Sequence, residues 1–177
     1  ILSCFLENEI NDKENTLVIS PAAGAMDRAR YLADIIKVDV GLFYKRRDLS
    51  KVVNGSNPIE AHEYLGKDLE GKTAIVVDDM IASGRSLIDV AEELKKRKAK
   101  KVYFFSTFAL FTNGPEVFIK AHKEKLFDKI YSTNLTYVPQ HILEKDWFVA
   151  ADCSKFLAEI IDYNNAGKSI SELIVKN

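Results

Sequence analysis

The chain has 177 residues, about the size of one α/β domain, and its 47% hydrophobic content is enough for one buried core. Its 25 basic and 26 acidic side chains nearly cancel, and a net charge of -1 argues against a nucleic-acid-binding or membrane-surface protein. No apolar run reaches transmembrane length, and the two cysteines show neither disulfide nor metal-ligand spacing. These features predict a cytoplasmic protein.

The first part of the chain predicts a strand, a helix and a second strand. Residues 17–20 form the short apolar run that is typical of a buried parallel strand, and Pro21 ends it. Apolar residues at helical spacing predict a helix of about three turns over 25–36. The β-branched and aromatic residues of 38–44 predict the next strand.

A basic triplet, residues 45–47 (Lys-Arg-Arg), follows that strand and precedes a polar segment over 49–58. The triplet can be a solvated charge run beside an acid, or a group of cations that meets an anionic substrate. Residues 59–71 predict an arm that returns into the next strand.

The most informative stretch joins a predicted strand to a predicted helix. An apolar run over 73–77 ends in Asp78 and Asp79, passes through a Ser/Gly loop, and opens a helix near Ser86. Ligands bind at the carboxyl end of strands in open α/β sheets, and a helix N-terminus attracts an anion, most often phosphate. Carboxylates there can accept hydrogen bonds from sugar hydroxyls or help to hold a divalent cation. The stretch therefore predicts a phosphorylated-sugar site; the alternative is a simple turn in which Asp79 or Ser83 only caps the helix.

The rest of the chain continues the alternation of strands and helices. The apolar side of the last predicted helix is expected to pack in the core, and Asp152 is expected to cap that helix. The lysine-rich residues 95–98 are expected to complement a helix dipole. The further predicted elements are strands at 102–106 and 129–133, a helix from Pro115 to about 125, an edge strand at 147–149, and a helix whose apolar side holds Phe156, Leu157, Ile160 and Ile161.

Residues 76–86 resemble the ribose-phosphate-binding fingerprint of type I phosphoribosyltransferases and phosphoribosyl pyrophosphate synthetases. In that family, four apolar residues lead into two acids, two apolar residues and a Thr/Ser-Gly-x-Thr/Ser loop. The resemblance implies that the first acid, here Asp78, contacts the ribose hydroxyls and that the loop wraps the 5-phosphate. The substrate-binding residues implied in this way are Asp78, Asp79, Ala82, Ser83, Gly84, Arg85 and Ser86.

Two further segments resemble the synthetases in particular. The basic triplet and its arm are similar to their catalytic loop, which implies that Lys45 is the transition-state lysine and that Arg47 contacts phosphate. Cations placed where charge develops suit phosphoryl-type transfer. Residues 20–24 resemble a Ser-Pro-Asp-x-Gly segment whose Asp is a magnesium ligand. The corresponding residue here is Ala22, which offers no oxygen ligand, so no residue of this chain is assigned to a metal.

Two other positions depart from the synthetase pattern. Phe108 stands where a His is usual, and Arg85 stands where a glycine is common. A residue other than glycine narrows the backbone angles of a phosphate loop, whereas the Arg85 guanidinium could also reach a pyrophosphate. Both effects of Arg85 stay open.

The resemblance covers residues 18–174 and matches the second of two similar synthetase domains. It implies that residues 1–177 form a single domain with a mainly parallel sheet flanked by helices. The first domain would be absent and the chain, which begins at Ile1, would be a fragment. The implied enzyme is a ribose-phosphate pyrophosphokinase of nucleotide biosynthesis, a homo-oligomer that uses Mg²⁺. It transfers the pyrophosphoryl group of ATP to ribose 5-phosphate, giving phosphoribosyl pyrophosphate and AMP.

Two alternatives belong to other functional classes. One is a stand-alone phosphoribosyltransferase, against which the basic arm and the lack of an obvious base-recognising segment argue. The other is a non-catalytic regulatory partner of true synthetases, which Ala22 favours.

Overall fold

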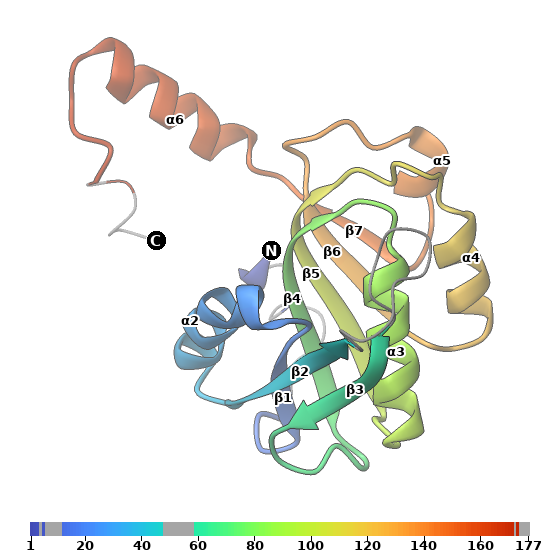
Figure 1. Ribbon diagram of the computed structural model, residues 1–177. Coiled ribbons are helices and arrows are strands. Elements are labelled where there is room, and N and C mark those ends of the chain that lie inside the picture. The colour runs from blue at the N-terminus through green and yellow to red at the C-terminus, as the bar shows by residue number, and fades with distance from the viewer. Residues whose placement is uncertain (4, 6–11, 48–58, 172, 174–177) are drawn as a thin grey trace.

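The computed structural model describes residues 1–3, 5, 12–47, 59–171 and 173, and of residues 45–47 and 59–62 it describes the backbone alone. A seven-stranded sheet forms the centre, in the order β3-β2-β1-β4-β5-β6-β7 (Figure 1). Neighbouring strands are parallel except for β2 and β3, which confirms the predicted fold class. The strands are β1 (Thr16–Ser20), β2 (Asp39–Arg47), β3 (Ile59–Leu65), β4 (Thr73–Ile81), β5 (Lys101–Ala109), β6 (Lys129–Thr133) and β7 (Phe148–Ala151).

Helices cover both faces of this sheet. Helix α2 packs on one face, whereas α3 and α4 pack on the other (Figure 1). No helix in the described part of the chain has the length and apolar character needed to cross a bilayer. The helices are η1 (Ala23–Ala25), α2 (Met26–Ile36), α3 (Arg85–Lys96), α4 (Glu116–Lys123), α5 (Gln140–Leu143) and α6 (Ser154–Asn165).

The central strands are apolar on both sides because each side faces a layer of helices. In β4, Ala74 and Val76 belong to the core under α3 and α4, while Ile75 belongs to the core under α2. In β5, Phe104 and Tyr103 are divided between the two cores in the same way. Successive side chains of a strand point to opposite faces, so a strand covered on both sides reads as a continuous apolar run.

Strands β2 and β4 are longer than predicted. Strand β2 continues through the basic triplet to Arg47, because β3 returns antiparallel beside it and supplies the ladder partners. Strand β4 continues to Ile81 and not only to residue 77, because Ile81 still pairs with Ala109 of β5. Both acids of the motif therefore lie on a strand and not in the loop.

The prediction that the last helix packs in the core is wrong. No residue of α6 is buried, with Phe156 37% and Ile161 53% exposed, and α6 projects away from the sheet (Figure 1). Helical spacing identifies an apolar face, but it does not say whether another surface covers that face. Asp152 does act at the start of α6, where its carboxylate accepts a hydrogen bond from the N–H of Ser154 at 2.9 Å.

Phe5 is an anchor to which the sequence analysis gave no role. Its side chain is fully buried, and its ring lies 4.9 Å from the rings of Tyr103 and Phe105 and 5.3 Å from that of Tyr131, measured between centroids. These edge-on contacts tie the start of the chain to strands β5 and β6.

We therefore expect Phe5→Ala to lower the free energy of unfolding by about 3–5 kcal/mol, because it leaves a cavity among three rings. Phe156→Ala on α6 is the matched control, and its effect should stay within about 0.5 kcal/mol. Urea unfolding of the two variants measures both values. Equal losses would mean that α6 contributes to the core after all.

Candidate functional site

The candidate site lies where β4 ends and α3 begins. The predicted acid pair, Asp78 and Asp79, occupies the last part of β4, and the loop after Ile81 leads into α3 at Arg85. A hollow of about 200 Å³ at this point is lined by Asp78, Asp79, Met80, Ile81, Ala82, Ser83, Gly84, Ser86 and Leu87. The fold thus gathers six of the seven predicted substrate-binding residues around one cavity.

Arg85, the seventh of these residues, lines a different hollow. Its side chain lies between α3 and α4 together with Val117, Lys120 and Glu124. Arg85 is the first residue of α3 and does not line the hollow that holds the acid pair, whereas its neighbour Ser86 does.

A basic residue that the sequence analysis missed contacts both acids. The Arg28 guanidinium on α2 lies 3.0 Å from Asp78 Oδ1 through Nη1 and 3.3 Å from Asp79 Oδ2 through Nη2. The only sequence signal for it is that α2 follows β1, the neighbour of β4 in the sheet. Since Arg28 and Asp78 are 50 residues apart, this contact could be found only once the strand order was known.

The two acids differ in their surroundings. The side chain of Asp78 is 25% exposed and that of Asp79 is 52% exposed. Burial raises the pKa of Asp78 above its ordinary value of 3.8, opposed by the hydrogen bond from the Asp79 N–H and by Arg28. Slight burial also acts upward on Asp79, but its bond with Asp78 and the charge of Arg28 outweigh it, so the pKa of Asp79 is lowered.

Gly84 is the residue on which the loop geometry depends. It has φ of 80°, a left-handed conformation that glycine adopts without cost, and it is the N-cap of α3. A Cβ at this position would lie 2.1 Å from the Phe118 ring of α4. The N-cap residue of α3 is Gly84, which has no side chain to cap the helix, and among the described residues neither Asp79 nor Ser83 accepts a hydrogen bond from the first N–H groups of α3. The first N–H groups of a helix without a side-chain cap suit an anion.

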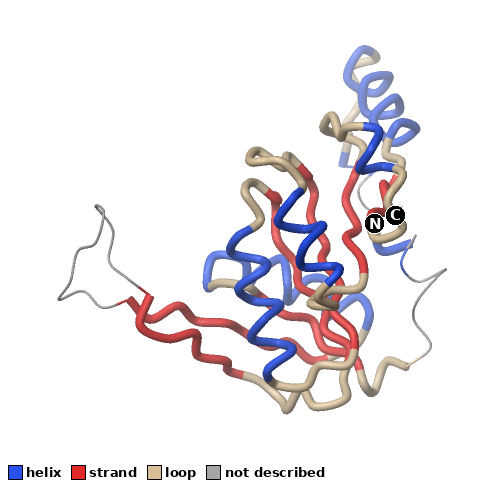
Figure 2. Tube along the Cα trace, turned by 90° about the vertical axis from the view of Figure 1, so that its right-hand side faces the viewer, coloured by secondary structure: helices blue, strands red, loops and turns tan. Residues whose placement is uncertain are grey.

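The predicted catalytic cations lie on β2. The backbone of Lys45 pairs with that of His62 and Arg47 with Ile59, while their side chains lie outside the described part of the chain. In the neighbouring strand β1, Ser20 pairs with Leu42 of β2, and Ile19 pairs with Val76 of β4. Lys45 and Asp78 therefore both lie beyond the carboxyl end of β1, at the same edge of the sheet. Figure 2 shows β2 and β3 extending outward from that sheet as a long arm.

The segment that resembles a magnesium-binding site supplies no ligand side chain in this chain. Ala22 is exposed just before η1, and its carbonyl oxygen accepts hydrogen bonds from the Ser20 hydroxyl at 2.7 Å and from the Ala25 N–H at 3.0 Å. Among the residues described there is no group of three His, Cys, Asp or Glu side chains that could hold an ion. The acid pair is already neutralised in part by Arg28.

A mostly parallel α/β sheet with an acid pair beside an open helix N-terminus is typical of proteins that bind phosphorylated ligands. A sequence profile described as "Phosphoribosyl transferase domain" matches residues 3–141. The chain belongs to the phosphoribosyl transferase domain family.

Several known proteins are similar to this chain. It is 31% identical over 155 residues to the ribose-phosphate pyrophosphokinase of Mycoplasma genitalium, which covers 86% of this chain and 44% of that protein. It is 30% identical to ribose-phosphate pyrophosphokinase 5 of Schizosaccharomyces pombe, over 100% of this chain and 48% of that protein. The crystal structure of phosphoribosylpyrophosphate synthetase from Mycobacterium smegmatis has a TM-score of 0.75 at 21% identity, covering 94% of this chain and 50% of that one. The chain spans about half the length of the curated relatives it matches.

We expect Gly84→Ala to lower the free energy of unfolding by about 2–4 kcal/mol, from a strained φ and a clash with Phe118. Gly71→Ala is the matched control: Gly71 has φ of 73° but open space around its Cα, so only about 1 kcal/mol should be lost there. Urea unfolding measures both. A loss at Gly84 no larger than that at Gly71 would remove Phe118 from the explanation.

We expect Asp78→Asn to keep or increase stability at neutral pH. Because the pKa of Asp78 is raised in the folded state, its ionisation disfavours folding as pH rises above 3.8, the unfolded value. The variant should therefore gain stability relative to the wild type as the pH is raised, which unfolding curves over a pH series measure. Lower stability of the variant at pH 7 would mean that the pairing with Arg28 outweighs burial.

Proposed function

We propose that this chain is the ribose-phosphate-binding half of a ribose-phosphate pyrophosphokinase. The observation that carries the proposal is the acid pair placed beside the α3 N-terminus within one hollow of about 200 Å³. The names of the similar proteins from Mycoplasma genitalium and Schizosaccharomyces pombe support the same activity. The reaction is transfer of the pyrophosphoryl group of ATP to the anomeric oxygen of ribose 5-phosphate, with AMP as leaving group.

Two kinds of group would hold ribose 5-phosphate. The 5-phosphate meets the N–H groups of the loop from Ala82 to Ser86, where the helix dipole favours an anion. The ribose hydroxyls donate hydrogen bonds to Asp78 and Asp79, whose carboxylates are held in place by Arg28 and by backbone N–H groups at 2.9 Å. Hydrogen bonds to charged groups are among the stronger polar contacts, so the acid pair gives the sugar its affinity.

The basic arm would supply the cations for transfer. Strands β2 and β4 are separated in the sheet by β1 alone, so where β1 lies between them their backbones are roughly 10 Å apart. Lys45 and Arg47 lie on β2 past the end of β1, at the same edge of the sheet as the acid pair. Cations brought to the transferred group stabilise the charge that develops on it. Lys45 and Arg47 are the catalytic residues of the proposal.

The remaining parts of the proposal concern groups outside this chain. ATP is the second substrate, and the other half of the relatives' length would complete its site. Magnesium stays a prediction, since the described residues supply no set of ligands for it, and no step is assigned to it. A homo-oligomer likewise stays a prediction.

Isothermal titration of this chain with ribose 5-phosphate tests the binding half of the proposal. We expect the wild type to bind and Asp78→Asn to bind roughly ten- to a hundredfold more weakly, because a charge-assisted hydrogen bond is lost. Asp89→Asn on α3, outside the hollow, should leave the affinity unchanged. Lys45→Ala should also keep most of the affinity, because this lysine acts on the transferred group. In a protein that carries the relatives' full length, Lys45→Ala should instead abolish most AMP formation.

Three outcomes would contradict the proposal. If ribose 5-phosphate does not bind the wild type, the β4–α3 loop is not a working sugar-phosphate site. Equal effects of Asp78→Asn and Asp89→Asn would remove Asp78 from it. If the full-length protein binds the sugar phosphate but forms no AMP from ATP, the non-catalytic regulatory alternative replaces the enzyme.

A further inference from the structure

A second, larger hollow lies at the opposite edge of the sheet. It has a volume of about 880 Å³, and we call it the lysine hollow after six of its lining residues: Lys95, Lys100, Lys101, Lys123, Lys125 and Lys129. We propose that the lysine hollow binds a small polyanion of the polyphosphate class, separately from the β4–α3 loop. The proposal does not depend on the function proposed above.

The register of the strands separates the two sites. Lys101 and Lys129 are the first residues of β5 and β6, so they lie at the amino ends of these strands. Lys101 pairs with Thr73, which precedes Asp78 by five residues along β4. At about 3.3 Å per residue, the lysine hollow begins roughly 16 Å from the acid pair.

The lining of the hollow carries an excess of positive charge, which the chain as a whole does not have. Its six lysines face two aspartates, Asp128 and Asp146, although the chain as a whole has a net charge of -1. Asp128 is partly engaged elsewhere, because its carboxylate accepts a hydrogen bond from the Val102 N–H at 2.8 Å and lies 4.0 Å from Lys95. Like charges gathered in this way repel one another, and an anion relieves that repulsion.

Three of the lysines have ammonium groups that are available to a ligand. Lys100, Lys123 and Lys125 are exposed, and within the described part of the chain their side chains form no hydrogen bond or salt bridge. The charge of Lys100 does act on one carboxylate, because it helps to lower the pKa of Asp12. Lys95 and Lys101 are instead directed by local contacts: Lys95 Nζ donates to the carbonyl of Lys100 at 3.2 Å, and Lys101 Nζ donates to the Tyr103 hydroxyl at 3.1 Å. Local contacts therefore hold the Lys95 and Lys101 side chains, whereas those of Lys100, Lys123 and Lys125 can reach a ligand.

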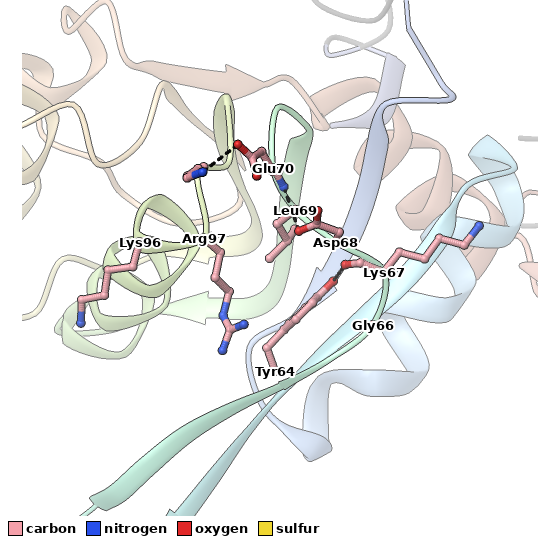
Figure 3. A pocket seen from close by; sticks show the side chains of 9 residues that line it. Tyr64, Gly66, Lys67, Asp68, Leu69, Glu70, Lys96 and Arg97 are labelled. Atoms are coloured by element: carbon pink, nitrogen blue, oxygen red, sulfur yellow. Dashed lines mark hydrogen bonds and ion pairs between the residues drawn. The ribbon is translucent and has the colours of Figure 1, made fainter.

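In a neighbouring hollow of this protein, the basic side chains have partners. It has a volume of about 370 Å³ and is lined by Tyr64, Lys96, Arg97 and Lys98 among others (Figure 3). Here Lys98 pairs with Glu70 at 2.8 Å and Lys96 pairs with Glu93 at 2.6 Å, while the Arg97 guanidinium lies over the Tyr64 ring. Cations that already have partners do not need a ligand. The lysine hollow differs from this neighbouring hollow because it contains lysines without such partners among the residues described.

Lys125 occupies a backbone position that does not favour lysine. It follows α4 with φ of 58°, a left-handed conformation that glycine or asparagine adopts more easily after a helix. Cations near a helix C-terminus do complement the helix dipole, and Lys37, the C-cap of α2, has a similar φ of 61°. Lys37 therefore offers a comparison for Lys125 with the same backbone strain but outside the hollow.

The lining also indicates the class of ligand. The volume falls within the range of roughly 300–1,000 Å³ that small-molecule sites occupy. Lysines act as point charges that can meet phosphates without a fixed geometry, whereas arginine binds a carboxylate or a phosphate through two parallel hydrogen bonds. Tyr103 and Phe127 are buried below the surface, so neither ring offers a face on which a base could stack. The hollow therefore recognises charge and not a base.

Titration with inorganic tripolyphosphate at constant ionic strength tests this proposal, with lysine acetylation mapped by mass spectrometry to locate the bound anion. We expect tripolyphosphate to protect Lys100, Lys123 and Lys125 from acetylation but not Lys155 on α6. Lys125→Gly should weaken binding at least threefold, and Lys123→Gln combined with it at least tenfold. Lys37→Gly should leave binding unchanged.

Thermal unfolding without anion separates this role from a structural one. Lys125→Gly and Lys37→Gly should each raise the midpoint by about 2–4 °C, because glycine relieves a left-handed residue. A purely structural Lys125 would lower the midpoint and leave binding unchanged. Equal weakening by Lys37→Gly and Lys125→Gly, or protection limited to residues of the β4–α3 side, would overturn the proposal. Tighter binding of a short DNA duplex than of tripolyphosphate would also overturn it, in favour of a nucleic-acid surface.

Discussion

The parallel ladder of β1, β4 and β5 is the constraint on which both ends of the molecule depend. β4 pairs with β1 on one side and with β5 on the other, and its residues Ala74, Ile75 and Val76 are fully buried. Since these strands run in one direction, their carboxyl ends share one edge of the sheet and their amino ends share the other. The acid pair with the α3 N-terminus lies at the first edge, and the lysine hollow lies at the second. One hydrogen-bonding pattern thus places the acid pair and the lysine hollow at opposite edges of the sheet.

The candidate site keeps features that the fold alone would not favour. Half-buried Asp78 has a raised pKa, and its charge is held by the Arg28 guanidinium 3.0 Å away. Gly84 has a left-handed φ, and the Phe118 ring fills the space where a Cβ would lie. Residues that reduce stability are retained where they orient polar groups toward a ligand. Phe118 belongs to this arrangement although it never faces the hollow, because α4 fixes the entry into α3 through it.

Overall charge proved a poor guide to local charge. A net charge of -1 argued against a strongly charged surface, yet the ends of α3 and α4 and the starts of β5 and β6 gather six lysines around one hollow. The interpretation of residues 95–98 as partners of a helix dipole fits Lys95 and Lys96, which lie in the last turn of α3. It does not account for Lys123 and Lys125, which reach the same hollow from a different helix.

The sequence by itself determined the alternation of elements, the mainly parallel sheet and the loop after Asp79, because periodicity and motif spacing are local properties of the chain. Only the tertiary structure decided that Arg28 contacts the acid pair, that Arg85 lines a different hollow, and that six lysines line one hollow. These facts depend on strand order and helix docking, which bring together residues far apart in sequence. For α6, the sequence correctly predicted a helix with an apolar face. It could not show that no surface of the described chain covers that face.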